Sequence, residues 1–191
     1  MLPSSAFAPV ITPIFTPATK SVSLTMQLPQ NAATSSQHRL YVAGHFGNHF
    51  VSSDPYGGNA LGAGASADIF ITDRWAIDVE AWQSGRAPSQ IADVRTSQRG
   101  DFMDTLVGVS ALRRFGGAGV SPYLTVGVIG TRTQTRTPSG GFTINQQGPQ
   151  VGFGLMIPAG QRLFVVPEIR VMAEPLFVIA RPTIGITYRL R

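Results

Sequence analysis

The sequence contains no cysteine, so disulfide bonds and thiolate chemistry are excluded. It contains no apolar run close to the ~20 residues that a membrane-spanning helix needs. Charge is scarce as well, since charged residues make up 13% of the 191 residues and apolar residues 43%. The net charge of +5 comes from arginines scattered among apolar residues, without the aromatic and basic patch typical of nucleic-acid binding. We therefore expect no nucleic-acid partner.

Residues 61–84 show instead a regular alternation of side chains. Two stretches, 61–71 and 75–84, flank the short turn Thr72-Asp73-Arg74. Odd positions are nearly all apolar, whereas even positions carry small residues, the acids Asp68, Asp78 and Glu80, and the aromatics Phe70 and Trp82. Successive side chains of a β-strand point to opposite faces, so this stretch is predicted to be a two-stranded ribbon with one apolar side. Its small, acidic side is predicted to be the enclosed one.

The same alternation recurs along the chain and predicts eight strands, separated by segments rich in turn-forming residues. The expected strands are 39–50, 61–71, 75–84, 104–115, 122–133, 148–158, 162–173 and 181–190. Residues 1–37 are rich in proline, which blocks helices and central strands. We interpret 1–37 as a disordered N-terminal segment or the remnant of a signal peptide, and 38–191 as a β-barrel domain.

Strand length and loop pattern both indicate a membrane barrel. Most expected strands have 10 to 13 residues, whereas globular strands average ~5–6 and a tilted membrane strand needs ~9–11. The connections alternate between short and long, as in outer-membrane barrels. Because lipid cannot satisfy backbone N–H and C=O groups, a sheet that spans it must close. The predicted fold class is all-β, an eight-stranded antiparallel up-and-down transmembrane β-barrel.

The inward side of this barrel is predicted to carry an ionic plug. The expected lumen charge cluster comprises Arg39, Asp68, Asp78, Glu80, Glu168, Arg170 and Arg189. Eight strands enclose a space that their own side chains roughly fill, and buried charges must be paired or solvated. Carboxylates and guanidiniums in comparable number can satisfy one another there. No open pore is therefore expected.

Four stretches carry a family resemblance: residues 75–81 (WAIDVEA), 121–127 (SPYLTVG), 167–170 (PEIR) and 184–190 (IGITYRL). On these, residues 39–191 resemble the OmpA/OmpX-like outer membrane protein β-barrel domain family. The resemblance implies the bacterial outer membrane, outer-membrane lipid, lipopolysaccharide and the assembly machinery as partners, and a monomer. Such proteins usually end on an aromatic residue, whereas this chain ends on Arg191, with Tyr188 the nearest aromatic.

No residue constellation predicts catalysis, a cofactor or a metal. His45 and His49 share a strand face but lie ~13 Å apart at strand rise, too far for one metal ion. Asp78 and Glu80 are close enough to couple, although neutralisation by arginine explains them better than acid–base work. The glycine-rich runs precede no helix and are therefore not phosphate cradles. The chain is predicted not to be an enzyme.

Two classes of function remain open at this stage. One is a small outer-membrane barrel with a structural or adhesion-like role, whose basic loops 85–103 and 134–147 meet surface polyanions or lipopolysaccharide. The other is a soluble lipocalin-like barrel that binds an apolar ligand and has the reverse polarity, with charges outside. A narrow porin or a lipid-modifying barrel enzyme are lesser alternatives.

Overall fold

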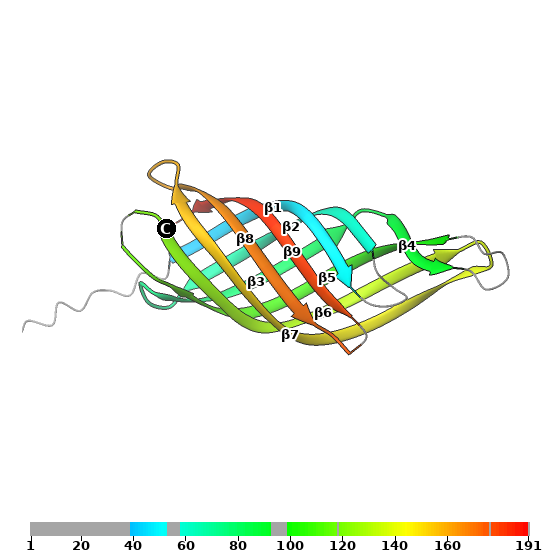
Figure 1. The fold of residues 1–191 in the computed structure, drawn as a ribbon. Coiled ribbons are helices and arrows are strands. Elements are labelled where there is room, and N and C mark those ends of the chain that lie inside the picture. The colour runs from blue at the N-terminus through cyan, green and yellow to red at the C-terminus, as the bar shows by residue number, and fades with distance from the viewer. Residues whose placement is uncertain (1–38, 53–57, 93–98, 118, 176, 191) are drawn as a thin grey trace, which may run out of the picture. The chain divides into compact units, whose positions relative to one another are not determined.

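The computed structural model describes residues 39–52, 58–92, 99–117, 119–175 and 177–190. The segment 1–37, predicted to be disordered or a signal remnant, lies outside the described residues. Nine strands form in the described part of the chain (Figure 1): β1 (Arg39–Ser52), β2 (Gly58–Phe70), β3 (Trp75–Ser84), β4 (Ala87–Ala92), β5 (Arg99–Arg114), β6 (Ser121–Thr137), β7 (Gly140–Pro158), β8 (Leu163–Ala173) and β9 (Val178–Arg189).

The strands form one closed antiparallel sheet. Strands that follow one another in the chain pair, except β3 and β4. In addition β1 pairs with β9 and β3 pairs with β5, which closes the ring. The short strand β4 adds no position to the ring, because it pairs with β5 at Arg99–Phe102, beyond the stretch that β3 covers. Eight strand positions therefore surround the lumen, and the predicted eight-stranded antiparallel barrel is confirmed. In this ring β3 and β8 are four positions apart in either direction, so they form opposite walls.

The two ends of the barrel differ in their connections. The turns 71–74, 115–120 and 159–162 join strands at one end, here called the short-turn end, where β1 begins and β9 finishes. At the other end, called the long-strand end, β5, β6 and β7 continue beyond their neighbours (Figure 1). The prediction of polar loops over 85–103 and 134–147 was wrong. Both stretches are largely strand, since β4 and β5 occupy most of the first and only residues 138–139 separate β6 from β7 in the second.

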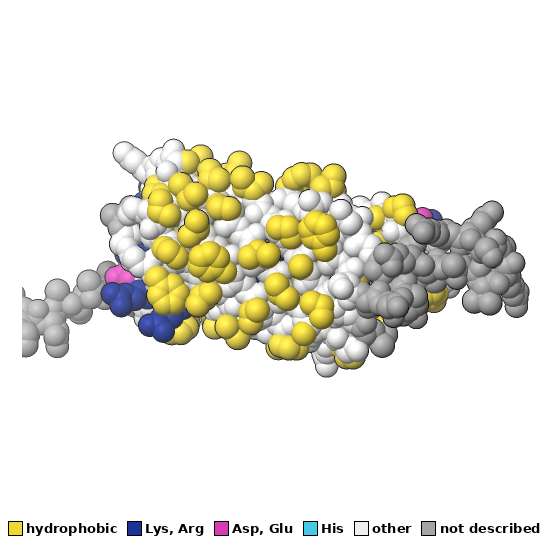
Figure 2. All heavy atoms as spheres, in the orientation of Figure 1, with side chains coloured by type: hydrophobic (Ala, Val, Ile, Leu, Met, Phe, Trp, Pro, Cys, Tyr) yellow, Lys and Arg dark blue, Asp and Glu magenta, His cyan; other side chains and the backbone are white. Residues whose placement is uncertain are grey.

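The wall of the barrel is apolar outside and polar inside, as the alternation predicts. Along β3 exposure alternates strictly, so that Ile77 is 41% exposed and Asp78 is 0% exposed. Apolar side chains cover the outer wall between the two ends (Figure 2). This polarity is the reverse of that of a soluble lipocalin-like barrel, and that alternative is therefore wrong. None of the described residues forms a helix that is long and apolar enough to cross a membrane.

The lumen is filled in three layers along its axis. A cluster at the short-turn end contains Tyr41, Phe70, Ala76, Leu112, Tyr123, Met156 and Val166, with Phe164 packed against it. A cluster toward the long-strand end contains Val51, Ala60, Trp82, Ala87, Phe102, Leu106, Ile129, Met172, Phe177 and Ile179. Apart from Ala43, the inward positions between these clusters belong to polar residues and glycines.

Inward glycines make room for these large side chains. A Cβ atom on Gly152 would lie 2.4 Å from Thr125 Oγ1, and one on Gly127 would lie 2.1 Å from the carbonyl oxygen of Val109. Gly130, on the outer face of β6, is different because its Cβ would meet no atom closer than 3.9 Å. Glycine is thus a packing requirement at the inward positions and not at the outward one.

Candidate functional site: the lumen network and the two barrel ends

Arg170 spans the middle of the lumen. It projects inward from β8, and its Nη1 donates to Asp78 Oδ2 and to Glu80 Oε1, each at 2.7 Å, both on the opposite wall β3. Its Nε donates to Glu168 Oε1 at 2.5 Å on its own strand. The side chain is 3% exposed. One guanidinium therefore ties two opposite walls together through charge-assisted hydrogen bonds, the strong class of hydrogen bond.

A second arginine, Arg181 of β9, completes this group. Its Nη2 donates to Glu80 Oε2, and its guanidinium lies 4.8 Å from the ring centroid of Trp82. We call Asp78, Glu80, Glu168, Arg170 and Arg181 the ionic network. All five are buried. Arg181 has the same odd numbering as the inward residues of the last predicted strand, 181–190, and could have been assigned to the lumen on that basis. It was missed because it is the first residue of that strand and precedes a proline.

The predicted lumen charges divide into two groups. Asp78, Glu80, Glu168 and Arg170 come together in the ionic network. Asp68 of β2 is also buried and lies directly opposite Asp78 in the strand register. Four carboxylates thus face two guanidiniums in the middle of the lumen.

Arg39 and Arg189 do not belong to this cluster, which corrects the prediction. Arg39 makes an exposed ion pair of 2.9 Å with Asp73, and Arg189 Nη2 donates to the carbonyl of Gln161 at 2.8 Å. Both lie at the short-turn end. Strand parity gives the face of a side chain but not its depth along the barrel, and these two residues stand at the strand ends.

A second polar group lies nearer the long-strand end. His49 Nε2 and Asp104 Oδ2 are 2.7 Å apart and both side chains are fully buried. The hydroxyl of Thr131 donates to Glu174, which follows the end of β8. Burial raises the pKa of Glu174 above its ordinary value. Asp104, Thr131 and Glu174 were not found from the sequence, because their strand ends carry weak alternation.

His45 and His49, the two described histidines, bond different partners. His45 Nε2 bonds Ser66 Oγ at 2.9 Å, whereas His49 bonds Asp104. Within the described ranges, no group of three His, Asp or Glu side chains could hold a metal ion. In the lumen, Arg170 and Arg181 partly neutralise the buried carboxylates.

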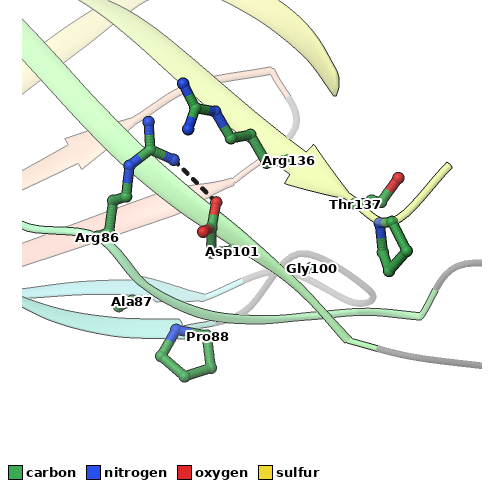
Figure 3. Close-up of a pocket in the computed structure, with 8 residues that line it drawn as sticks. Arg86, Ala87, Pro88, Gly100, Asp101, Arg136 and Thr137 are labelled. Carbon is green, nitrogen blue, oxygen red and sulfur yellow. Dashed lines mark hydrogen bonds and ion pairs between the residues drawn. The ribbon is translucent and has the colours of Figure 1, made fainter. Parts of the chain in front are cut away.

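The long-strand end carries an open hollow of about 510 Å³, whose lining residues are drawn in Figure 3. The side chains of Arg86, Asp101 and Arg136 border it, together with Ala87, Pro88, Gly100, Thr137 and Pro138. Arg86 Nη1 donates to Asp101 Oδ1 at 3.0 Å, as the dashed line marks. Arg136 is exposed and stands opposite Asp101 in the pairing of β5 with β6.

Comparison with known proteins identifies the architecture. Residues 21–174 match the model of the outer membrane protein beta-barrel domain family. Among solved structures, Neisserial surface protein A is similar, with a TM-score of 0.63, 16% identity and coverage of 78% of this chain and 96% of that one. Ail, the attachment invasion locus protein of Yersinia pestis, solved with the heparin analogue sucrose octasulfate, has a TM-score of 0.61, 15% identity and coverage of 80% and 99%.

The N-terminal β-barrel domain of Pseudomonas aeruginosa OprF gives a TM-score of 0.56, 16% identity and coverage of 80% and 98%. No curated protein sequence matches the chain. The family match spans most of the sequence and agrees with the closed sheet, the apolar outer wall and the resemblance found in the sequence. This chain therefore belongs to the outer membrane protein beta-barrel domain family and is an eight-stranded β-barrel of the bacterial outer membrane.

Proposed function

We propose that this protein is a closed barrel that presents a basic surface for contact with anionic polymers outside the cell, and that it is neither a channel nor an enzyme. The observation that carries the proposal is the filling of the lumen by two apolar clusters with the ionic network between them. A barrel that conducts nothing through its centre acts through the surface that it holds in the membrane. That surface is the long-strand end, because the longer connections of outer-membrane barrels face outward.

The seal has three successive parts. The apolar cluster around Tyr41 and Met156 closes the short-turn end, and the cluster around Leu106 and Met172 closes the other. Between them the ionic network joins opposite walls through Arg170. A cavity between the network and the first cluster offers only about 10 Å³, which is at the lower limit for one water molecule. A path for ions would require several buried side chains to move together.

The basic surface lies on the outward side of the extended strands. On β6 the outward positions change from Val126 and Val128 to Arg132 and Arg136, which marks the passage from hydrocarbon to water. Among the described residues, no carboxylate forms an ion pair with Arg132 or Arg136, while Asp101 is already paired with Arg86. Unpaired guanidiniums are good donors to sulfate and phosphate groups. They support contact with sulfated polymers or with lipopolysaccharide.

The structure of Ail with sucrose octasulfate suggests a suitable probe. We expect the full chain in detergent to bind sucrose octasulfate, and the double variant Arg132→Gln/Arg136→Gln to bind it on the order of tenfold more weakly, since each exposed charge contact contributes about 0.5–1 kcal/mol. The matched control, Arg113→Gln/Arg162→Gln, removes the same charge at the short-turn end and should bind normally. Equal weakening in both doubles would refute the assignment of this surface.

A separate measurement tests the sealed lumen. In planar bilayers the wild-type protein should show no steady unitary conductance. Reproducible steps of a single size would contradict the closed barrel and favour the narrow porin. This outcome is independent of the binding result, so the two parts of the proposal can fail separately.

The buried polar group near the long-strand end does not favour an enzyme. Ser84 Oγ accepts the backbone N–H of Asp104, and His49 bonds the carboxylate of the same residue. All three side chains are buried, so a lipid substrate has no access to them in this conformation. Their hydrogen bonds fit a role in packing.

A further inference from the structure

A basic cavity at the short-turn end is separate from the surface and the lumen network described above. It has a volume of about 530 Å³, a size typical of small-molecule sites. Four arginines from different segments of the chain line it: Arg39 of β1, Arg74 of the β2–β3 turn, Arg114 of β5 and Arg189 of β9. We call this cavity the vestibule.

The charge in the vestibule is poorly balanced. Asp73 is the one acid among the described residues that line it, and its carboxylate is 2.9 Å from Arg39 Nη2. Within the described part of the chain, Arg114 Nη2 and Arg189 Nη2 donate only to backbone carbonyls, those of Asp73 and Gln161. Each guanidinium carries five N–H donors in a planar fork, so most donors of these side chains remain available.

Arg114 is the most constrained of the four. Its guanidinium lies 5.4 Å from the ring centroid of Phe70, and its Nε is buried with no hydrogen-bond partner among the described residues. A buried N–H group without a partner is costly and therefore uncommon. An anion in the vestibule would lie next to the guanidinium of Arg114, which its contact with Phe70 keeps in place.

The vestibule has a closed floor and an open mouth. Tyr41, Met156 and Phe164 line its inner part and belong to the apolar layer that separates it from the ionic network. At the mouth, a Cβ on Gly117 or Gly119 would meet no atom of the described residues within 4 Å. A ligand could therefore enter from the short-turn side but could not pass through the barrel, which distinguishes a binding site from a pore entrance.

From these features we propose that the vestibule binds a phosphate ester, with the phosphate against the arginines and a carbon body against Phe164 and Met156. Guanidinium forks match phosphate oxygens in geometry, and several cations favour a group with more than one anionic oxygen. The short turns of outer-membrane barrels face the periplasm. The phosphate can therefore come from a phospholipid headgroup of the inner leaflet or from a soluble periplasmic ester.

Neighbouring arginines at the same end supply the control. Arg113 precedes Arg114 on β5 but points outward, where its guanidinium lies 5.2 Å from the ring centroid of Trp75. Arg162 is also exposed and does not line the vestibule. The pairs Arg74/Arg114 and Arg113/Arg162 therefore carry equal charge at the same end, but only the first lies in the cavity.

The test uses the full chain in maltoside detergent, with heat-modifiable gel migration to show that each variant is folded. Glycerol 1-phosphate should bind saturably, Arg74→Gln/Arg114→Gln should weaken it at least tenfold, and Arg113→Gln/Arg162→Gln should change it less than twofold. If the first double fails to fold, Arg39→Gln/Arg74→Gln takes its place with the same expectation.

A second arm identifies the source of the phosphate by native mass spectrometry with phosphatidylglycerol and phosphatidylcholine. Retention of phosphatidylglycerol by the wild type, lost in Arg74→Gln/Arg114→Gln, supports the site and assigns a headgroup. Binding of glycerol 1-phosphate without lipid retention supports the site and assigns a soluble ester. Absence of saturable binding for both probes, or equal loss in the two doubles, overturns the proposal.

Discussion

Replacing Arg170 with methionine tests whether the lumen is a dry, sealed space. Methionine keeps an unbranched side chain of similar length but removes the guanidinium that bonds Asp78, Glu80 and Glu168. Three carboxylates that are at most 5% exposed would then lose their shared cation. Breaking a buried ion pair by removing one partner costs about 3–5 kcal/mol, because the remaining charge is left uncompensated. We expect the free energy of unfolding to fall by about that amount.

The size of the loss in unfolding free energy distinguishes a dry lumen from a water-filled one. If water filled it, the pairs would be screened like surface salt bridges, whose contribution is about 0–1 kcal/mol. A surface pair in this same protein gives the internal reference, since Arg86 and Asp101 form an exposed pair of 3.0 Å. Arg86→Met should therefore cost less than about 1 kcal/mol. Both substitutions remove a guanidinium. The difference between their effects on the free energy of unfolding therefore reflects how well water screens each ion pair.

The measurement is urea unfolding of each variant in phosphatidylcholine vesicles, followed by tryptophan fluorescence and by heat-modifiable gel migration. A loss for Arg170→Met below about 1 kcal/mol, equal to that of Arg86→Met, would refute the sealed lumen. The double variant Arg170→Met/Asp78→Asn gives a second check. It removes one uncompensated carboxylate, so it should be more stable than Arg170→Met alone.

Three further predictions follow from the packing and polarity of the wall. Gly127→Ala should destabilise the barrel by about 1–3 kcal/mol because its Cβ meets a strand carbonyl, whereas Gly130→Ala should be nearly neutral; urea unfolding compares them. Val79→Arg on the lipid face of β3 should cost about 2–4 kcal/mol and Gln83→Arg, near the water boundary, at most about 1 kcal/mol. Because burial raises the pKa of Glu174, its ionisation destabilises the fold as pH rises above the ordinary carboxyl range. Glu174→Gln should therefore be at least as stable as wild type at pH 7, with the difference vanishing at low pH; a constant difference would contradict this.

The sequence alone predicts the closed wall well, because lipid imposes a simple rule on each strand. Outward positions such as Ile77 and Val79 must be apolar, and inward positions such as Asp78 and Glu80 need not be. Each strand between the two water boundaries therefore carries a readable alternation. The polarity of the barrel and its fold class follow from this pattern before any coordinate is known.

The same rule explains where prediction from the sequence fails. Beyond Val128 and Pro149 the strands β6 and β7 leave the hydrocarbon, and residues such as Arg132 and Asn145 can face outward in water. The alternation of apolar and polar residues then disappears although the backbone hydrogen-bond pairing continues. For this reason the extended parts of these strands were predicted to be loops. The position of a side chain along the barrel axis cannot be predicted from alternation either. Alternation assigns Arg39, at a strand end, to the same face as side chains in the middle of the lumen.

Strand register poses a problem that the hydrophobic pattern solves only in part. A one-residue slip of β8 would point the side chains of Glu168 and Arg170 outward toward the lipid. An arginine facing lipid at the bilayer midplane costs about 2–4 kcal/mol. A two-residue slip restores the apolar wall and meets no such penalty. It would, however, move Arg170 and Glu168 together by about 7 Å along the barrel, breaking the 2.7 Å bonds from Arg170 to Asp78 and Glu80 on β3.

The same slip would also misplace the inward glycines. Arg170 now pairs with Gly152, whose missing Cβ leaves space for the guanidinium stem, 3.0 Å from where that Cβ would be. Two residues further along β7 stands Gln150, a buried side chain that already donates to Ser110 Oγ. Lipid therefore excludes one-residue slips, which exchange the inner and outer faces of a strand. The ionic network and the inward glycines exclude two-residue slips, which keep the faces unchanged. The polar lumen is what selects a single register among the ones that the membrane would accept.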